Sequence, residues 1–364
     1  MKLRLRPTLF PSTTRLYRKP LPLVAALLLK LSRDGTERLF CSTGILACVF
    51  MLSIAAQPKP PELLRVEGSV AAMGTGFTIA LYGEDRARLQ TIVAQGLAEA
   101  KRLDQMMSNY IPDSEWSEVN RNAADHPVRI SDELFQLLSA CVEYSRESEG
   151  AFDITVGPLM KVWGFYKGTG HLPHRAEVRG AMNLVGYRNL ILDPATHSVR
   201  FGKKGVEIDP GGIGKGYAVD RIAQILKDNG ITRGLVSGGG SSIYAIGTPP
   251  GEKGWKLDIK NPRDPSKAVE SLYLKDESMS TSGSYEKFFF AEGRMYSHIM
   301  DPRTGFPARG MLSTSVIAPR TIDSEAWTKP YYILGAYWAS QHRRKNFRVF
   351  FCEDKPGAQC EWLQ

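Results

Sequence analysis

Between residues 231 and 318 the chain consists of short strand-like segments that follow one another with little helical pattern between them. Segments with apolar residues at helical spacing lie before and after this region, over 85–107, 131–148 and 322–340. The order predicts an α+β or mixed α/β fold, a single catalytic domain with largely antiparallel sheets flanked by helices, rather than a doubly wound sheet. The expected strands are GFTIALYG, 189–192, 198–208, ITRGLVS, IYAIG, WKLDIKN, VESLYLK, EKFFFA, MYSHI, STSVIA and FRVFFCE.

The formal net charge of +9 is concentrated at the N-terminus. The rest of the chain is close to neutral, which argues against a nucleic-acid partner. Acids are absent from the first 33 residues, whose bases are Lys2, Arg4, Arg6, Arg15, Arg18, Lys19, Lys30 and Arg33.

Two apolar runs, 21–31 and 40–57, accompany these bases. Residues 1–57 therefore predict a secretory signal or membrane anchor, followed by a proline-rich linker (58–66) and a domain over 67–364. We expect export, to the periplasm or the outer face of the cytoplasmic membrane, with membrane association through the leader. A buried helix of the domain, or acylation at Cys48, remains an alternative.

Three cysteines lie in the expected domain, and no pair of them has zinc-finger spacing. Cys352 and Cys360 flank a Pro-Gly turn that could bring them together. In an oxidising compartment, a disulfide between them and two free thiols are equally compatible with the sequence. Cys141 lies in an apolar run and is expected in the core.

The stretch IDPGGIGKGYAVDRI (208–222) combines an apolar strand signal, a glycine-rich turn and the start of a helix. A helix N-terminus beside glycines and Lys215 favours an anion, but the same glycines also suit a packing turn. Neither the Walker spacing nor the full GxGxxG spacing is present. Alone, the stretch leaves both readings open, and a second glycine cluster, SGGGSS (237–242), shares this ambiguity.

Two further groups of residues are candidates for catalysis or metal binding. His298 ends a strand ahead of a proline turn, where an imidazole can act as a base or have a purely structural role. Asp323 and Glu325 begin the last helix, with Thr328 one turn later. Such carboxylates interact with the helix dipole or, together with a hydroxyl, hold Mg²⁺.

Taken together and in their order along the chain, the motifs resemble those of the ApbE family of FAD:protein FMN transferases, whose fold is related to the T-fold. The matching stretches extend from Met73 to Gly335. They are MGT (73), SNYIPDSEWSEVN (108), GAFDITVGPL (150), DPGGIGKGYAVD (209), the glycine loop with IYAIG (239–247), STSGSYEKFF (280), HIMDPRTGFP (298) and an acidic last helix.

The resemblance implies that Mg²⁺-bound FAD is cleaved at its pyrophosphate, that AMP leaves, and that FMN joins a threonine of an acceptor flavoprotein, a redox-complex subunit. His298 would be the base, and Lys215 would assist the transfer. The metal would sit on the Gly212 carbonyl and the last helix. The residues implied to contact FAD are Met73, Tyr110, Ala151, Phe152, Asp153, Asp209, Lys215 and Ile299.

The last helix departs from the family pattern, which has Asp and, four residues later, Thr. Here Glu325 and Lys329 occupy these positions. Three explanations remain open: Thr328 or Asp323 replaces the missing ligand, the Lys329 ammonium partly replaces the cation, or magnesium binds more weakly. A Mg²⁺-dependent FAD pyrophosphatase and a flavin-binding lipoprotein without turnover are the alternative functions.

Overall fold

The structure, a computed structural model, describes residues 62–357 and 359–363. At its centre lies an eight-stranded sheet in the order β1-β2-β6-β7-β10-β15-β16-β17, and every neighbouring pair is antiparallel. This arrangement confirms the predicted α+β class. The strands are β1 (Leu64–Ala72), β2 (Thr75–Gly83), β6 (Gly234–Gly238), β7 (Ser242–Ile246), β10 (Ser278–Gly283), β15 (Met311–Ala318), β16 (Arg348–Glu353) and β17 (Glu361–Trp362).

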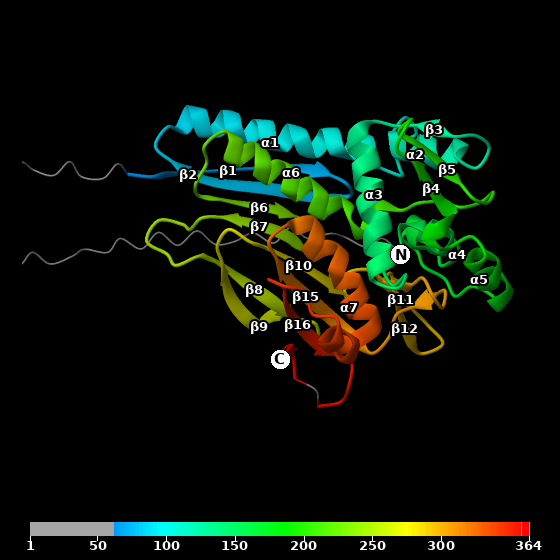
Figure 1. Ribbon diagram of the computed structural model, residues 1–364. Helices are drawn as coiled ribbons and strands as arrows, with labels where there is room; N and C mark the ends of the chain where they lie inside the picture. The colour runs from blue at the N-terminus through cyan, green and yellow to red at the C-terminus, as the bar shows by residue number, and fades with distance from the viewer. Residues whose placement is uncertain (1–61, 358, 364) are drawn as a thin grey trace, which may run out of the picture. The chain divides into compact units, whose positions relative to one another are not determined.

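Three long helices cover one face of this sheet (Figure 1). They are α1 (Arg86–Met107), α6 (Gly214–Asp228) and α7 (Thr321–Gln341). Successive strand residues point to opposite faces, so Val316 of β15 packs under the helices whereas Ile317 packs on the other side. The period-two pattern of the strands thus produces two separate cores.

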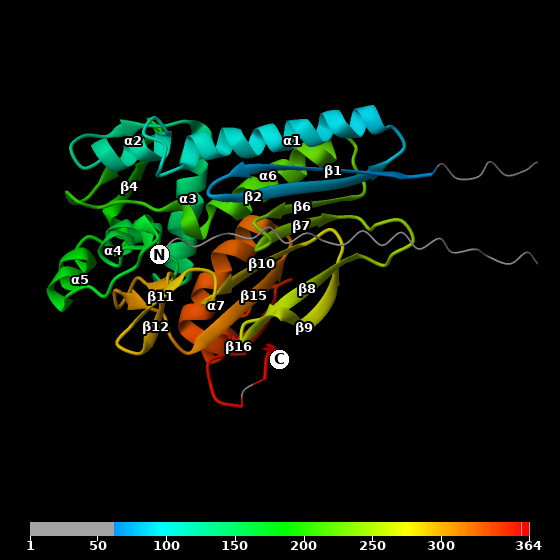
Figure 2. The ribbon, with the colours of Figure 1, turned by 180° about the vertical axis from the view of Figure 1, so that it is seen from behind.

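The second core lies under a long hairpin, which Figure 2 shows from the side opposite to that of Figure 1. Strands β8 (Trp255–Asn261) and β9 (Asp264–Leu274) form this hairpin. Trp255 and Leu274 pack there against Met279 of β10 and Phe350 of β16.

Short strands and helices, together with the 16-residue helix α3, surround one end of the central sheet. A three-stranded sheet has the order β3-β5-β4, and two small hairpins, β11-β12 and β13-β14, precede β15. These elements are α2 (Glu115–Asn122), β3 (Val128–Arg129), α3 (Asp132–Glu147), α4 (Gly157–Val162), α5 (Arg175–Met182), β4 (Leu190–Asp193), β5 (Ser198–Phe201), β11 (Phe288–Ala291), β12 (Arg294–Ser297), β13 (Met300–Asp301) and β14 (Phe306–Pro307).

Polar side chains cap two of the helices at their N-termini. The side chains of Asp85 and Ser131 accept hydrogen bonds from backbone N–H groups three residues later, which caps α1 and α3.

Strand β1 was not expected, and it begins at Leu64, inside the segment assigned to the linker. The short helices α2 and α4 were also missed, and the strand expected over 198–208 ends at Phe201. Elements this short give little periodicity to detect.

The cysteine expectations have clear outcomes. Cys352 and Cys360 form a disulfide, and Cys141 is fully buried in the main core.

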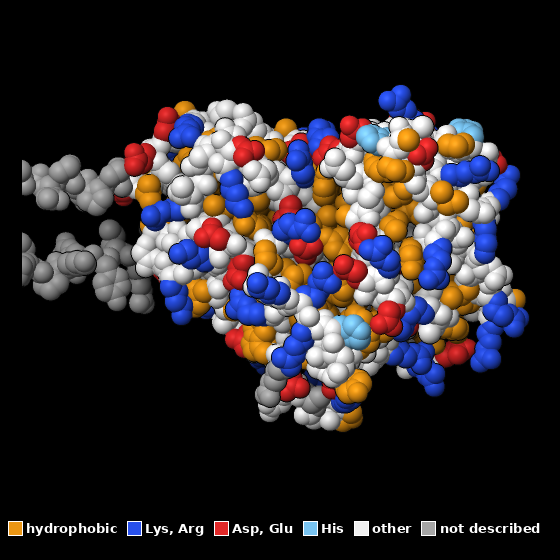
Figure 3. Space-filling model, viewed as in Figure 1, with side chains coloured by type: hydrophobic (Ala, Val, Ile, Leu, Met, Phe, Trp, Pro, Cys, Tyr) orange, Lys and Arg blue, Asp and Glu red, His pale blue; other side chains and the backbone are white. Residues whose placement is uncertain are grey.

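The leader, with Cys48, lies outside the described residues. Among the described helices, none is both long and apolar enough to cross a membrane. On the face seen in Figure 3, Lys and Arg side chains are interspersed with Asp and Glu.

Candidate functional site

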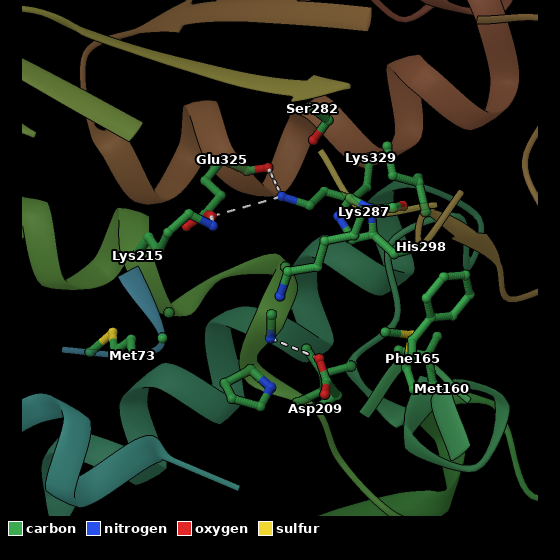
Figure 4. A pocket seen from close by; sticks show the side chains of 18 of the residues that line it. Met73, Met160, Phe165, Asp209, Lys215, Ser282, Lys287, His298, Glu325 and Lys329 are labelled. Carbon is green, nitrogen blue, oxygen red and sulfur yellow. Dashed lines mark hydrogen bonds and ion pairs between the residues drawn. The ribbon is translucent and has the colours of Figure 1, made fainter. Parts of the chain in front are cut away.

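A cavity of about 460 Å³ opens beside the N-terminal turns of α6 and α7, a size typical of ligand sites. Figure 4 shows side chains from several elements entering it. Among the predicted site residues, Thr328 and Asp323 do not line it. Those that do are Met73, Tyr110, Ala151, Phe152, Asp153, Asp209, Gly212, Lys215, His298, Ile299, Glu325 and Lys329.

The glycine motif positions α6 against α7. After a 3₁₀ turn at Pro210–Gly212, α6 begins at Gly214. The Asp220 carboxylate accepts hydrogen bonds from the backbone N–H groups of Thr321 (2.7 Å) and Ile322 (2.8 Å), which caps α7. A Cβ added to Gly216 would lie 2.6 Å from the Thr321 carbonyl oxygen, so this close approach requires glycine.

Glu325 is the buried anion of the site, with a side chain only 2% exposed. Its Oε1 accepts a hydrogen bond from Lys215 Nζ at 2.8 Å, and its Oε2 accepts one from the backbone N–H of Gly216. Burial alone would raise the pKa of Glu325, but the positive charges of Lys215 and Lys329 lower it below its usual value. The carboxylate is therefore ionised and already paired.

Lys329 lies one helical turn after Glu325. Its Nζ donates to the Glu325 carbonyl oxygen at 3.0 Å and lies 4.0 Å from Oε1. Burial lowers the pKa of Lys329 to about 8, an effect that the attraction of Glu325 opposes and the repulsion of Lys215 reinforces. The ammonium is thus charged at neutral pH.

The other metal candidates do not complete an oxygen ligand set. The Thr328 hydroxyl is fully buried, 2.7 Å from both the Ser282 hydroxyl and the Glu325 carbonyl oxygen. Asp323 does not line the cavity, and its carboxylate accepts hydrogen bonds from Arg320 and Tyr144.

Mg²⁺ prefers an octahedral set of oxygen ligands, and a charged ammonium has no lone pair to offer. One carboxylate shared by Lys215 and Lys329 therefore does not fit a divalent cation. In residues 62–357 and 359–363, no group of three or more His, Cys, Asp or Glu side chains is placed to hold a metal.

Asp209 organises the glycine turn. Its Oδ1 accepts a hydrogen bond from the Gly211 N–H at 2.8 Å. Its Oδ2 accepts hydrogen bonds from the Tyr166 hydroxyl at 2.7 Å and from Asn109 Nδ2 at 3.2 Å. The carboxylate thus joins the turn to two other segments that line the cavity.

His298 lies between β12 and β13, one residue after the end of the strand in which it was expected. Its Nδ1 is 3.1 Å from the carbonyl oxygen of Lys287. Because that oxygen only accepts, Nδ1 carries the proton of the neutral ring and Nε2 keeps its lone pair. Burial lowers the pKa of His298 to about 4, and the charges of Lys287, Lys215 and Lys329 act in the same direction. The imidazole is therefore neutral at physiological pH, with one basic nitrogen available.

Aromatic and apolar groups form much of the remaining wall. Tyr110 is 73% exposed and stands edge-on to Tyr166, with ring centroids 6.4 Å apart. Met73 occupies the β1–β2 turn with a φ of 50°. The carboxylate of Asp153 is bound by the Thr155 hydroxyl (2.7 Å) and the Tyr187 N–H (2.6 Å), so it fixes this wall.

The sequence interpretation did not name several polar residues that line the cavity, among them Asn109, Tyr166 and Lys287. Asn109 and Lys287 lie within motifs used for the family resemblance, so closer attention to those motifs would have found them. Tyr166 has no comparable signal, because its contact with Asp209 joins residues 43 positions apart.

Comparisons with known proteins show the family of this chain. A sequence model of the ApbE family matches residues 73–351. A FAD:protein FMN transferase of Klebsiella pneumoniae (strain 342) is 32% identical over 272 residues, which are 73% of this chain and 82% of that protein. A FAD:protein FMN transferase of Salmonella typhimurium is 30% identical over 330 residues, 85% of this chain and 91% of its own length.

Solved structures show the same relationship. The ApbE protein of Thermotoga maritima matches with a TM-score of 0.75 and 30% identity, covering 82% of this chain and 96% of that chain. The flavin transferase ApbE from Vibrio cholerae matches with a TM-score of 0.70 and 25% identity, covering 83% of this chain and 97% of that chain. The sequence match includes the glycine turn, His298 and the acidic part of α7, and we conclude that this chain belongs to the ApbE family.

Proposed function

We propose that this chain is a FAD:protein FMN transferase, which cleaves FAD and attaches FMN through a phosphoester to a threonine of an acceptor flavoprotein. The observation that carries the proposal is the meeting of Lys215, Lys287 and Lys329 with a neutral His298 in one cavity. Phosphoryl transfer depends on positioning and positive charge, and the acceptor hydroxyl needs a base. The relatives that are FAD:protein FMN transferases support the same reaction.

The cavity suits a ligand with both flat rings and phosphates. The exposed ring of Tyr110 is available for stacking. The first turn of α6 carries Lys215 at the positive end of the helix dipole, and both favour an anion. We therefore assign the pyrophosphate of FAD to the α6 and α7 side of the cavity.

In the proposed step, the threonine Oγ attacks the phosphorus of the FMN half of FAD. The hydroxyl proton passes to Nε2 of His298 and later to solvent. The new Oγ–P bond forms while the bond from this phosphorus to the bridging oxygen breaks, and that oxygen leaves on AMP with the electron pair. The lysines stay protonated and neutralise the phosphate oxygens.

The family resemblance also implies Mg²⁺, which would neutralise the same oxygens. Because Glu325, Thr328 and Lys329 do not form the oxygen ligand set of a divalent cation, no step of this proposal uses the metal.

The test is to incubate the full chain with FAD and the apo form of a redox subunit that carries FMN on threonine, with and without Mg²⁺. We expect the acceptor to gain the mass of FMN less one water and AMP to appear in equal amount. The same acceptor with its threonine replaced by alanine is the control and should gain no mass.

Two outcomes would overturn the proposal in favour of the alternatives. Free FMN and AMP with an unmodified acceptor would identify a FAD pyrophosphatase, in which water replaces threonine. Bound, unchanged FAD would identify a flavin-binding protein without turnover.

We also propose that the protein acts after export, at the periplasmic side of a membrane. The basic, apolar leader over 1–57 supports this location, as does the Cys352–Cys360 disulfide, since such bonds persist in oxidising compartments. Cell fractionation tests the location, and recovery of the chain in the cytoplasmic fraction would contradict it.

A further inference from the structure

Positive charge exceeds negative charge around the buried carboxylate of the site. Glu325 is the ion-pair partner of both Lys215 (2.8 Å) and Lys329 (4.0 Å), and among the described residues neither lysine pairs with another acid. Both ammonium groups are mostly buried, with side chains 26% and 19% exposed. Uncompensated buried charge is unfavourable, so this arrangement favours an anionic ligand.

A third cation enters the cavity from a separate element. Lys287, on the loop between β10 and β11, forms no ion pair within residues 62–357 and 359–363. Figure 4 shows the side chains of Lys215, Lys287 and Lys329 approaching the cavity from three different elements. A ligand held among them meets positive charge from several sides.

Lys329 occupies the space that the sequence had assigned to a cation. A Cβ added to Gly212 would lie 3.5 Å from Lys329 Cε, and Lys329 Nζ donates to the Glu325 carbonyl oxygen. The lysine therefore lies close to both segments that were expected to share a metal. The Glu325 carboxylate, the expected acidic ligand, instead binds Lys215 and the Gly216 N–H.

We propose that the Lys329 ammonium is the resident cation of this site and neutralises the pyrophosphate of FAD in place of a divalent metal. The inference rests on the proposed function, because it takes FAD as the ligand. The ammonium donates hydrogen bonds to phosphate oxygens, keeps its proton and forms no covalent bond. Lys215 supplies the second charge, and its pairing with Glu325 holds it beside the ligand.

The first test is FAD binding to the wild-type chain, followed by isothermal titration calorimetry and flavin fluorescence. We expect the affinity in EDTA to equal that in millimolar Mg²⁺ within about twofold, and Mg²⁺ alone to give no binding heat. Tight binding only with Mg²⁺ would overturn the inference. This comparison needs no variant, so a folding defect cannot obscure it.

The second test uses substitutions at one position. Lys329→Met should weaken FAD binding on the order of tenfold or more in EDTA, the size of a lost charge-assisted hydrogen bond. Lys329→Thr introduces the hydroxyl that the family pattern has at this position and should make FAD binding depend on Mg²⁺. Lys256→Met, at an exposed lysine of β8 outside the cavity, is the matched control and should change nothing. Unchanged binding by Lys329→Met would contradict the inference.

Failure of the inference and failure of the proposed function give different results. If the wild type transfers FMN only with Mg²⁺, the function stands and the role of Lys329 is wrong. If FAD binds equally well with and without Mg²⁺ but no acceptor is labelled under either condition, the role of Lys329 stands and the transferase function is wrong.

Discussion

Nζ of Lys215 lies 2.8 Å from Oε1 of Glu325, although 110 residues separate them. The pair joins the first turn of α6 to the first two turns of α7, the two elements that face the expected phosphates. Its geometry depends on the residue after Lys215, because Gly216 leaves room for the α7 backbone and donates its own N–H to Glu325. A glycine that the sequence could assign to a phosphate cradle thus also has a packing role.

Gly216→Ala should destabilise the fold by about 1–3 kcal/mol, the usual cost of overpacking. The added Cβ would meet the Thr321 carbonyl oxygen at 2.6 Å, a backbone atom that cannot rotate away. FAD binding should weaken as well, because Lys215 and Glu325 would separate. Chemical denaturation measures the first effect and FAD titration the second.

Gly180→Ala is the matched control for this substitution. Gly180 also lies in a helix, α5, but nothing stands within 4 Å of an added Cβ. We expect unchanged or slightly higher stability. Equal effects of the two substitutions would contradict the packing role of Gly216.

His298→Ala should reduce FMN transfer by about 10²–10⁴-fold, the usual contribution of general base catalysis, while FAD binds within a few-fold of normal. The reason is that Nε2 of His298 is the basic nitrogen left free by the bond to Lys287. Single-turnover transfer with FAD already bound is the measurement. His126→Ala, at an exposed histidine outside the cavity, is the control, and retained transfer by His298→Ala would rule out the assigned base.

The lowered pKa of His298 predicts a pH dependence of stability. The unfolded chain binds a proton at this position below about pH 6.5, whereas the folded chain stays unprotonated until about pH 4. The free energy of unfolding should therefore fall as the pH decreases from 6.5 to 4. Denaturation of His298→Gln at pH 7 and pH 5 should show a smaller difference than the wild type. NMR titration of the His298 ring gives the pKa directly, and a value near 6.5 would refute the prediction.

Asp209→Ala should weaken FAD binding about tenfold or more, because it releases the glycine turn from Tyr166 and Asn109. Loss of the bond to the Gly211 N–H should also lower stability by about 1 kcal/mol. Asp193→Ala is the matched control, since Asp193 accepts a similar bond from the Ala195 N–H at 2.9 Å, outside the cavity. We expect it to lose stability but not FAD affinity. An equal loss of affinity in both variants would show that the effect is not specific to the turn.

Removing the C-terminal disulfide with Cys360→Ser should lower the free energy of unfolding by about 2–3 kcal/mol, as expected for a short closed loop. The bond joins residues eight positions apart and holds β17 against β16. Thermal unfolding of the oxidised wild type and the variant measures the loss. Because the cavity is lined by other elements, FAD affinity should not change, and a change would connect this strand to the site.

The sequence was most informative where a local pattern determines a local structure. The long helices were predicted because their apolar residues recur at helical spacing over many turns, and Asp85 and Ser131 cap two of them. Strand β1 and the short helices α2 and α4 were missed because few residues carry the periodicity. The contacts of β1 with its partner strand stabilise it more than its own sequence does.

By itself, the sequence determined the fold class and the family and pointed to twelve of the residues that line the cavity, because these follow from motifs of neighbouring residues. The tertiary structure alone decided what those residues do to one another. Folding brings Lys329, Lys215 and Gly216 around one buried carboxylate, and in this low-dielectric setting the pairing of Glu325 with ammonium groups replaces the oxygen ligand set that the motif implied.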